Sequence, residues 1–405
     1  MKDIVYVGLG YIGLPSAVVA ANSGFNVLGV DVDLNIVSSV NDGKTHISEP
    51  FLEKALQESV NSGFLRAAVY PDYADVFVVV VPTPFDSEMM PDTSLVEAAT
   101  KAVIPFLKEG DLFIIESTCP VGTTEKIAEL IFSERPELEK ELSIAYCPER
   151  VLPGNILFEL VHNDRVIGGL TSIASAHAKQ FYLKFVTGEI HLSNARTAEL
   201  CKLAENSFRD VGIAFANELS IISHDAGIDI WELINLANRH PRVNILSPGC
   251  GVGGHCIAVD PWFLISTNKK QSELIKTARV RNDAKSDWCI QQAKIAIDEF
   301  DQVSLGRPLR VACMGLAFKP DVDDLRQSPA LKIGTTIAKI EGIDALMVEP
   351  NIECIPDFIL TESKQAYELA DIVIWLVGHS HFRAINKDPS KVEIDFCGIR
   401  VKDCQ

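Results

Sequence analysis

The chain has 405 residues, 47% hydrophobic and 23% charged, and is long enough for two or three globular domains. Its 37 Lys and Arg against 55 Asp and Glu give a formal net charge of −18, which argues against a general nucleic-acid or anionic-membrane surface. Ten scattered cysteines, no long apolar span and a strand directly after the first residues predict a cytoplasmic protein without signal peptide or membrane contact.

The N-terminal residues predict a dinucleotide-binding unit. A strand at residues 3–8 runs into GLGYIG at 8–13, followed by a helix at 14–23, a strand at 26–30 and then Asp31, 18 residues after Gly13. This order is far more specific than the glycine pattern alone. Pyrophosphate would approach the positive end of the helix. Asp31 would accept hydrogen bonds from a ribose diol and repel a 2′-phosphate, which favours NAD over NADP.

Further strands at 75–81, 112–116 and 144–147 continue the α/β alternation of a doubly wound sheet. Ligands of such sheets lie beyond the carboxyl ends of the strands, where the loops with Thr83, Thr118 and Glu149 begin. Thr118 is a candidate site residue, or equally a cap for a helix at 124–132. Glu149 is a candidate general base, although a loop glutamate is usually only solvated.

The middle of the chain predicts one long helix from residue 197 to about 226, because this stretch holds no proline and only one glycine. A polar stripe on this helix is most simply its solvated side, although Lys202 and Asn206, one turn apart, would also project together into a site. The stripe comprises Glu199, Lys202, Asn206, Asp210 and Asn217. A helix this long suits a dimer interface. Its apolar stripe recurs at three or four residues and contains Cys201, Ala204, Phe208, Val211, Phe215, Leu219 and Ile222.

The loop at 247–261, SPGCGVGGHCIAVDP, carries the most distinctive chemistry of the chain. Its glycines permit a tight turn that ends at Cys256, a candidate nucleophile four residues before Asp260. The alternative is a purely structural turn. The dinucleotide signature elsewhere in the chain favours the catalytic interpretation.

The C-terminal third repeats the strand-and-helix pattern without a GxGxxG motif, with strands at 309–314, 344–348 and 372–377. Lys319 and Arg326 precede a helix and form a candidate phosphate clamp, or equally surface ion pairs with Asp323 and Asp324. The sequence therefore predicts an α/β protein with two Rossmann-like, doubly wound parallel-sheet domains joined by a central helical domain with one long helix. The expected boundaries are 1–192, 193–300 and 301–405.

Together these segments resemble the UDP-glucose/GDP-mannose dehydrogenase family over almost the whole chain. Within the family, NDRVIGG at 163–169 and RHPRVNIL at 239–246 look most like the branch that oxidises UDP-N-acetyl-D-mannosamine, with the UDP-N-acetylglucosamine and UDP-glucose branches as alternatives. The matching motifs are GLGYIGLP at 8–15, VPTP at 81–84, ESTCPVGTT at 116–124, CPERVLPG at 147–154, LAENSFRD at 203–210, GVGGHC at 251–256 and GLAFKP at 315–320.

The resemblance implies oxidation of a sugar C6 alcohol to a carboxylate with two hydride transfers to NAD. Cys256 would form a thiohemiacetal and then a thioester, which water would release as the UDP-sugar uronate. Lys202 and Asn206 would stabilise the oxyanion, with Lys202 alternatively the base of the first oxidation. Asp260 would hold or activate water near Cys256, and Thr118 and Glu149 would position water. No metal is implied.

The resemblance also assigns binding residues. Arg242 would come from the second subunit of a homodimer, and Arg326 would meet the phosphates of cofactor or substrate. The cofactor set is Gly8, Gly10, Tyr11, Ile12, Gly13, Asp31, Thr83, Thr118 and Arg326. The substrate set is Glu149, Arg150, Val151, Lys202, Asn206, His240, Arg242, Gly253 and Lys319.

One position departs from the family pattern, because Cys250 stands where relatives commonly have proline or another residue without a thiol. A disulfide between Cys250 and Cys256 would switch the nucleophile off reversibly. The alternative is a small buried thiol in the place of proline. A zinc site from Cys250, His255 and Cys256 fits tetrahedral spacing poorly.

Two other functions remain open. A two-electron NAD-dependent hydroxyacid or sugar-acid dehydrogenase with the same layout would not need Cys256. A non-catalytic nucleotide-sugar-binding protein would not need Cys256, Lys202, Asn206 and Asp260 together.

Overall fold

The computed structural model describes residues 3–86, 88–152, 154–254, 256–300 and 305–401. The chain forms two compact units, the first comprising Met1–Glu205 with Trp262–Thr267, the second Asn206–Pro261 with Asn268–Gln405. His255, considered above as a metal ligand, lies outside the described residues. Within the described ranges, no helix combines the length and apolarity that crossing a membrane requires.

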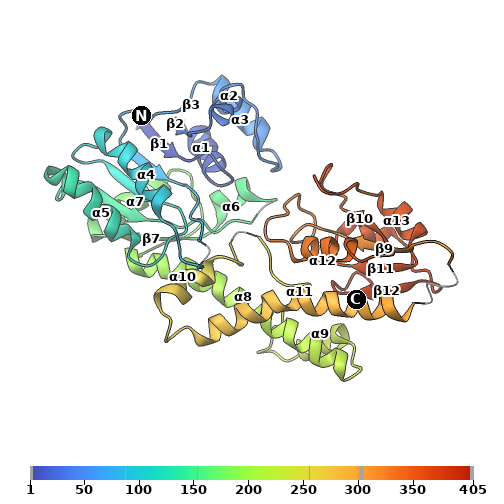
Figure 1. Ribbon diagram of the computed structural model, residues 1–405. Helices are drawn as coiled ribbons and strands as arrows, with labels where there is room; N and C mark the ends of the chain where they lie inside the picture. Colours follow the sequence, from blue (N-terminus) through green and yellow to red (C-terminus); the bar gives the residue numbers. More distant parts are fainter. Residues whose placement is uncertain (1–2, 87, 153, 255, 301–304, 402–405) are drawn as a thin grey trace. The chain divides into compact units, whose positions relative to one another are not determined.

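The first unit is built on one eight-stranded sheet of order β3-β2-β1-β4-β5-β6-β7-β8 (Figure 1). All neighbouring strands are parallel except β6 and β7, which are antiparallel. Near-continuous apolar runs form the central strands, as expected for strands covered on both faces. The strands are β1 (Asp3–Val7), β2 (Asn26–Val30), β3 (Leu65–Ala68), β4 (Val76–Val79), β5 (Leu112–Ile115), β6 (Ser143–Tyr146), β7 (Arg165–Gly169) and β8 (Ile190–Asn194).

Helices cover both faces of this sheet and bury two separate apolar clusters. The first face carries α1 (Gly13–Asn22), α3 (Leu52–Asn61), α6 (Ile156–His162) and α7 (Ser172–Tyr182), and the second carries α4 (Ser94–Val103) and α5 (Thr123–Glu134). Shorter elements are α2 (Leu34–Asn41), η1 (Ile104–Phe106) and η2 (Pro136–Leu138).

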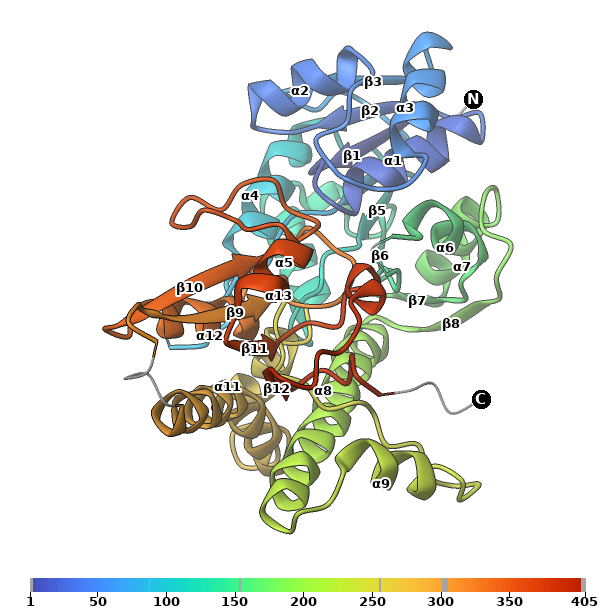
Figure 2. The ribbon, with the colours of Figure 1, turned by 90° about the vertical axis from the view of Figure 1, so that its right-hand side faces the viewer.

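The second unit contains a four-stranded parallel sheet of order β10-β9-β11-β12 (Figure 2). Its strands are β9 (Leu309–Met314), β10 (Ile343–Val348), β11 (Ile372–Trp375) and β12 (Val392–Asp395). One face packs against α11 (Glu273–Glu299) and α12 (Pro329–Ala338), the other against α13 (Ser363–Leu369) and η3 (Ser380–Ala384). The remaining helices are α8 (Ala195–Asp225), which begins in the first unit, α9 (Ile230–Ala237) and α10 (Asp260–Thr267).

The predicted fold class is confirmed, and the predicted strands agree with the observed ones to within two residues at each end. The first helix, α1, starts one residue before its predicted position. The long helix predicted from residue 197 to about 226 is α8. Strands β3, β7, β8 and β12 were not predicted.

The assignment of the polar stripe of α8 to solvent is wrong. Glu199, Asp210 and Asn217 have no exposed surface, and Lys202 is 6% exposed. The apolar stripe instead contains exposed residues, with Phe208 at 82%, Phe215 at 54% and Ile222 at 55%. Helix α8 therefore turns its polar side inward and part of its apolar side outward, the reverse of an ordinary surface helix.

Candidate functional site

The glycine turn after β1 has the shape of a phosphate cradle. Gly8 adopts φ +98°, and a Cβ there would lie 2.3 Å from the carbonyl oxygen of Val80. A Cβ at Gly13 would lie 1.9 Å from the carbonyl oxygen of Gly8. Gly10, by contrast, has no heavy atom within 4 Å of its Cβ position. Two glycines are therefore needed for the turn itself, and the third leaves open space beside the start of α1.

Asp31 stands at the end of β2 and is half-buried beside this turn. Its Oδ2 accepts a hydrogen bond from Leu9 N at 2.9 Å, and its Oδ1 accepts one from Asp33 N at 3.0 Å. The structure thus brings Asp31 together with the GLGYIG turn. Within this turn, Tyr11 and Ile12 are half-buried. Open space at Gly10 and an anchored carboxylate fit the pyrophosphate and the ribose diol of a dinucleotide.

Thr83 and Thr118 come from two neighbouring strand ends, after β4 and β5. The Thr83 hydroxyl donates to the carbonyl oxygen of Thr118 at 2.5 Å, so these two predicted residues lie side by side. Thr118 is not a helix cap, because α5 begins at Thr123 with Gly122 as its cap.

Lys202 and Glu149 form a pair in the first unit. The ammonium of Lys202 donates to the Glu149 carbonyl oxygen at 2.7 Å and lies 3.3 Å from its Oε1, while Oε2 accepts from Val151 N at 2.7 Å. Both side chains are largely buried, at 7% and 12% exposed. Arg150 instead pairs with Glu205 at 2.7 Å. Glu149 is therefore not a solvated loop residue, and its carboxylate keeps a lysine close to the end of β6.

Glu199 is a buried residue of this region to which the sequence assigned no role. Its carboxylate accepts hydrogen bonds from Gly122 N at 2.6 Å, Thr124 N at 2.8 Å and the Thr124 hydroxyl at 2.6 Å. Burial raises its pKa, and the hydrogen bonds from Thr124 and Gly122 lower it in part. Glu199 thus caps α5 from α8. Its position on the polar stripe, three residues before Lys202, was the available signal.

The Cys256 loop lies against the turn that follows β9 in the second unit. A Cβ at Gly253 would be 2.6 Å from the carbonyl oxygen of Gln327, and one at Gly254 would be 2.9 Å from the Phe318 ring. The amide of Gly254 donates to Arg326 O at 2.9 Å. GVGGHC and the segment with Lys319 and Arg326, both singled out from the sequence, are therefore packed together, which requires glycine at these positions.

Two further candidates meet at the end of this loop. The side-chain amide of Asn206 donates to Asp260 Oδ2 at 2.5 Å. The carbonyl oxygen of Cys256 accepts from Val259 N at 3.0 Å and Asp260 N at 2.8 Å, in the turn that starts α10. Asp260 therefore contacts both the backbone of Cys256 and the side chain of Asn206, and Cys256 is half-buried.

The remaining predicted binding residues are near the surface. Arg326 forms a two-pronged pair with Asp324, with 2.6 Å between Nη2 and Oδ2, as the ion-pair alternative expected. The Lys319 ammonium lies 5.7 Å from the centre of the Phe318 ring. His240 and Arg242 are exposed in the segment after α9, where His240 Nδ1 accepts from Arg242 N at 3.3 Å.

Neither Cys250 nor Cys256 forms a disulfide. Cys250 is buried in the apolar cluster under the second sheet and donates to Leu376 O at 3.4 Å. A hydrogen bond with Cys289, together with burial, raises the pKa of Cys250 well above its usual range. These contacts favour the small buried thiol over the regulatory disulfide.

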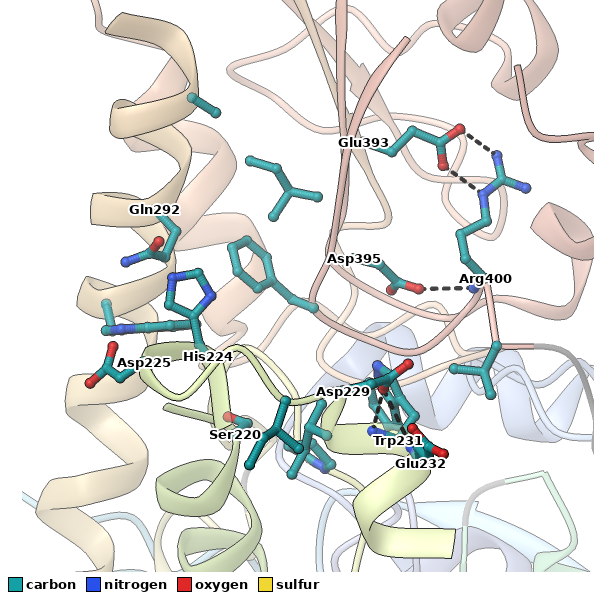
Figure 3. A pocket seen from close by; sticks show the side chains of 18 of the residues that line it. Ser220, His224, Asp225, Asp229, Trp231, Glu232, Gln292, Glu393, Asp395 and Arg400 are labelled. Atoms are coloured by element: carbon teal, nitrogen blue, oxygen red, sulfur yellow. Dashed lines mark hydrogen bonds and ion pairs between the residues drawn. The ribbon is translucent and has the colours of Figure 1, made fainter. Parts of the chain in front are cut away.

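A cavity of about 1300 Å³ lies in the second unit (Figure 3). Its walls come from α8, α9, α11, β12 and the residues after β12, and they include Trp231, Trp288 and Arg400. None of its described lining residues is a predicted site residue. Within the described ranges, His, Cys, Asp and Glu side chains form no group of three or more suited to a metal ion.

The sequence matches three domains of one protein family. Residues 2–186 match the NAD binding domain of the UDP-glucose/GDP-mannose dehydrogenase family, residues 196–284 its central domain and residues 312–398 its UDP binding domain. The chain belongs to this family. The predicted family and the predicted NAD cofactor are confirmed. The UDP binding domain coincides with the second sheet, which carries Lys319 and Arg326.

Similar proteins of this dehydrogenase family are known from curated sequences and solved structures. The chain is 50% identical over 400 residues, 95% of each chain, to a UDP-N-acetyl-D-mannosamine dehydrogenase of Escherichia coli (strain K12). It is 47% identical over 412 residues, 98% of this chain and 96% of the other, to an NDP-N-acetyl-D-galactosaminuronic acid dehydrogenase of Ralstonia nicotianae. A UDP-D-ManNAc dehydrogenase from Pyrococcus horikoshii superposes with TM-score 0.89 at 37% identity, covering 99% of this chain and 96% of that one.

Proposed function

We propose that this protein is an NAD-dependent UDP-N-acetyl-D-mannosamine 6-dehydrogenase that converts the C6 hydroxyl to a carboxylate. The names of its relatives support this substrate. The observation that carries the chemistry is the contact of Asp260 with both Asn206 of α8 and the backbone of Cys256, at the end of a glycine loop packed against the Lys319 segment. UDP-N-acetylglucosamine and UDP-glucose are the alternative substrates, because no sequence motif specifies the substituent and configuration at C2 of the sugar.

The reaction requires the C6 carbon to lose two hydrides. NAD, when bound, accepts the hydride of each oxidation. The first oxidation yields an aldehyde and needs a base together with help for the developing alkoxide. The Cys256 thiol then adds to the aldehyde, and oxidation of this thiohemiacetal gives a thioester. Water hydrolyses the thioester, which frees the thiol and the uronate.

The roles of the other residues follow from their chemistry. The Lys202 ammonium and the Asn206 amide are donors suited to an oxyanion, and the Asp260 carboxylate is suited to hold the attacking water. Glu149 keeps Lys202 in place through two contacts. Thr118 and Glu149 are proposed to position water. Arg326 is proposed for the phosphates, and Lys319, His240, Arg242, Gly253, Arg150 and Val151 for the UDP-sugar.

The stoichiometry of NADH tests the proposal. A panel of UDP-sugars is assayed by NADH absorbance, and two NADH per UDP-N-acetyl-D-mannosamine are expected from the wild type. The Cys256→Ser variant should fall to one NADH or none and make no uronate. Cys250→Ser, six residues away in the apolar cluster, is the matched control and should keep two.

One NADH per sugar from the wild type would instead identify a two-electron dehydrogenase, and none would identify a binding protein. Full uronate formation by Cys256→Ser would refute the thioester route. Wild type and Cys250→Ser, assayed before and after dithiothreitol, test the disulfide between Cys250 and Cys256. Equal loss of activity on oxidation in wild type and Cys250→Ser would eliminate it.

We also propose that the protein is a homodimer that pairs through α8. The exposed apolar side chains of this helix, Phe208, Phe215 and Ile222, recur every seven residues along one face. Such a stripe is unfavourable in water and fits a self-complementary two-fold interface. Because both subunits contribute the same residues to a two-fold interface, one charged substitution introduces two charges into it.

The oligomeric state tests this interface. Phe215→Glu should shift the mass measured by sedimentation or light scattering from two chains to one. Glu218→Gln, three residues along the same helix and half-exposed, is the control and should leave the mass unchanged. A wild-type chain that sediments as a monomer would refute the interface.

The cytoplasm is the proposed location, because none of the nine described cysteines forms a disulfide, as expected for a reducing compartment. We propose the boundaries 1–192, 193–300 and 301–405 for the NAD-binding, central helical and UDP-sugar-binding domains.

A further inference from the structure

Buried polar side chains hold the Cys256 loop at both of its ends. At the start, Asn217 Oδ1 accepts a hydrogen bond from Gly249 N at 2.9 Å. At the end, Arg279 Nη1 donates to the carbonyl oxygen of Ile257, the residue after Cys256, at 3.3 Å. The loop is thus fixed on α8 by Asn217 and on α11 by Arg279.

Four side chains, which we term the loop network, connect these two contacts. Asp210 Oδ1 accepts hydrogen bonds from Arg279 Nη1 at 2.5 Å and from Asn282 Nδ2 at 2.7 Å. Asn282 Oδ1 in turn accepts from Asn217 Nδ2 at 2.9 Å. The network comprises Asp210, Asn217, Arg279 and Asn282, and none of the four is more than 1% exposed.

Stability alone does not account for the ion pair in this network. Burial raises the pKa of Asp210 to about 6, although Arg279 and Asn282 act to lower it. The free-energy cost of removing this carboxylate from water therefore exceeds the stabilisation that Arg279 and Asn282 give to its charged form. Asp210 Oδ2 and Arg279 Nε, moreover, have no hydrogen-bond partner among the described residues. A buried ion pair of this kind is often no better for stability than apolar residues of similar size.

We propose that Arg279, oriented by Asp210, is a positioning residue that fixes the peptide next to Cys256 for the second oxidation. The inference rests on the function proposed above for Cys256. Without Arg279 the Ile257 carbonyl loses its guanidinium donor, although the α10 turn and the contact of Asn206 with Asp260 still hold the residues that follow. A displacement of the nucleophile by about 1 Å costs on the order of a hundredfold in rate.

The two oxidations differ in their need for this positioning. The first forms an aldehyde and does not use the thiol, whereas the second begins with attack by Cys256. A displaced thiol should therefore slow uronate formation more than the first hydride transfer. Free aldehyde should then leave the enzyme, so that fewer than two NADH form per sugar. A general loss of stability would lower both steps together.

The test compares three variants. Asp210→Leu with Arg279→Met replaces the pair by apolar residues of similar size and is expected to fold. Arg279→Lys keeps the charge and loses the planar guanidinium that contacts Asp210 and Ile257 together. Arg281→Met is the matched control, because Arg281 lies on the same helix but pairs with Glu218 at the surface, where it is 43% exposed.

For each variant we would measure kcat and KM for UDP-N-acetyl-D-mannosamine, NADH per sugar, aldehyde release, the melting temperature and the rate of Cys256 alkylation by iodoacetamide. The double variant and Arg279→Lys should lower kcat by about tenfold to a hundredfold. The KM should stay within about threefold, with aldehyde released and Cys256 alkylation altered. Arg281→Met should match the wild type in every readout.

A folded double variant with wild-type kcat, NADH stoichiometry and alkylation rate would overturn the proposal. If the double variant does not fold, Arg279→Lys decides by the same readouts. The Cys256→Ser assay is independent of these variants. If Cys256→Ser still makes uronate, the thioester route of the proposed function fails. If it does not, and the Arg279 variants behave as wild type, only the positioning role fails.

Discussion

The two sheets begin with the same backbone device and use it differently. Gly8 follows β1 with φ +98°, and Gly315 follows β9 with φ +90°. In each sheet the next strand ends at an acid, Asp31 after β2 and Glu349 after β10. The strand, the glycine turn and the acid are therefore common to both, although only the first matches an NAD binding domain.

The difference lies in what fills the turn. Asp31 accepts from Leu9 N but, among the described contacts, from no amide of Gly10, beside which the space is open. Glu349 is longer by one methylene and accepts from Leu316 N at 2.7 Å and from Ala317 N at 2.8 Å.

Residue 317 is a fully buried alanine. His379 Nε2 also contacts the Glu349 carboxylate, 3.1 Å from Oε2. The second turn is thus occupied by its own acid, whereas the first keeps a free cradle. The fold supplies the turn, and side chains decide whether a dinucleotide enters it.

The largest expected effects distinguish glycines that the turn needs for folding from the glycine that leaves open space for a ligand. Gly13→Ala places a Cβ 1.9 Å from the Gly8 carbonyl oxygen and should prevent the native turn, with loss of soluble or cooperatively melting protein. Gly10→Ala meets no atom within 4 Å, so the melting temperature should change by less than about 2 °C, since exposed changes stay within about 0.5 kcal/mol. Its NAD affinity, measured by calorimetry, should nevertheless fall by at least tenfold.

Gly24→Ala is a useful control for the chain around α1. Gly24 also has an open Cβ position, but its φ of +88° makes alanine strained there, and it is remote from the turn after β1 in the sequence. This variant should lose stability and keep its NAD affinity, the opposite of Gly10→Ala. Unchanged NAD binding by Gly10→Ala would show that the open space is not the cradle.

The sequence was most informative where structure is decided locally. The turn at 8–13, Asp31 and the length of α8 follow from spacings within about thirty residues, and the structure has them as expected. Burial of the polar stripe of α8 was missed. Its partners are distant in the chain, such as Asp210 with Arg279, 69 residues apart, and Glu199 with Thr124, 75 residues apart. Periodicity shows that a helix has two sides, and only the packing shows which side is wet.

The candidate residues show the same limit. The sequence selected Cys256, Asp260 and Asn206, and the structure groups them. It did not indicate Arg279 or Asn282, because a polar residue within a long helix such as α11 carries no local mark of its partner. Nor did it indicate that His379 and Glu349 close the second turn, since neither belongs to a glycine motif.

A smaller effect, on the free energy of unfolding, is expected from replacing Glu349, the acid that fills the turn after β9. Burial alone would raise the pKa of Glu349, but hydrogen bonds from His379, Leu316 N and Asn351 N outweigh it and hold the pKa below its usual range. A lowered pKa means that this carboxylate stabilises the folded state above the unfolded pKa of about 4.3. The contribution is lost as the pH falls through the folded value.

Glu349→Gln should therefore cost about 2 kcal/mol at pH 7, typical of hydrogen bonds to a charged group. The gap to the wild type should narrow below about pH 4. Glu349→Asp restores the shorter acid of the first turn and should lose one backbone contact, or about 1 kcal/mol. Glu353→Gln, an exposed glutamate four residues on, is the control. Urea unfolding at pH 7, 5 and 3 measures all three. A gap for Glu349→Gln that is constant with pH would mean that the buried carboxylate is not ionised, and the second turn would then not be closed by its charge.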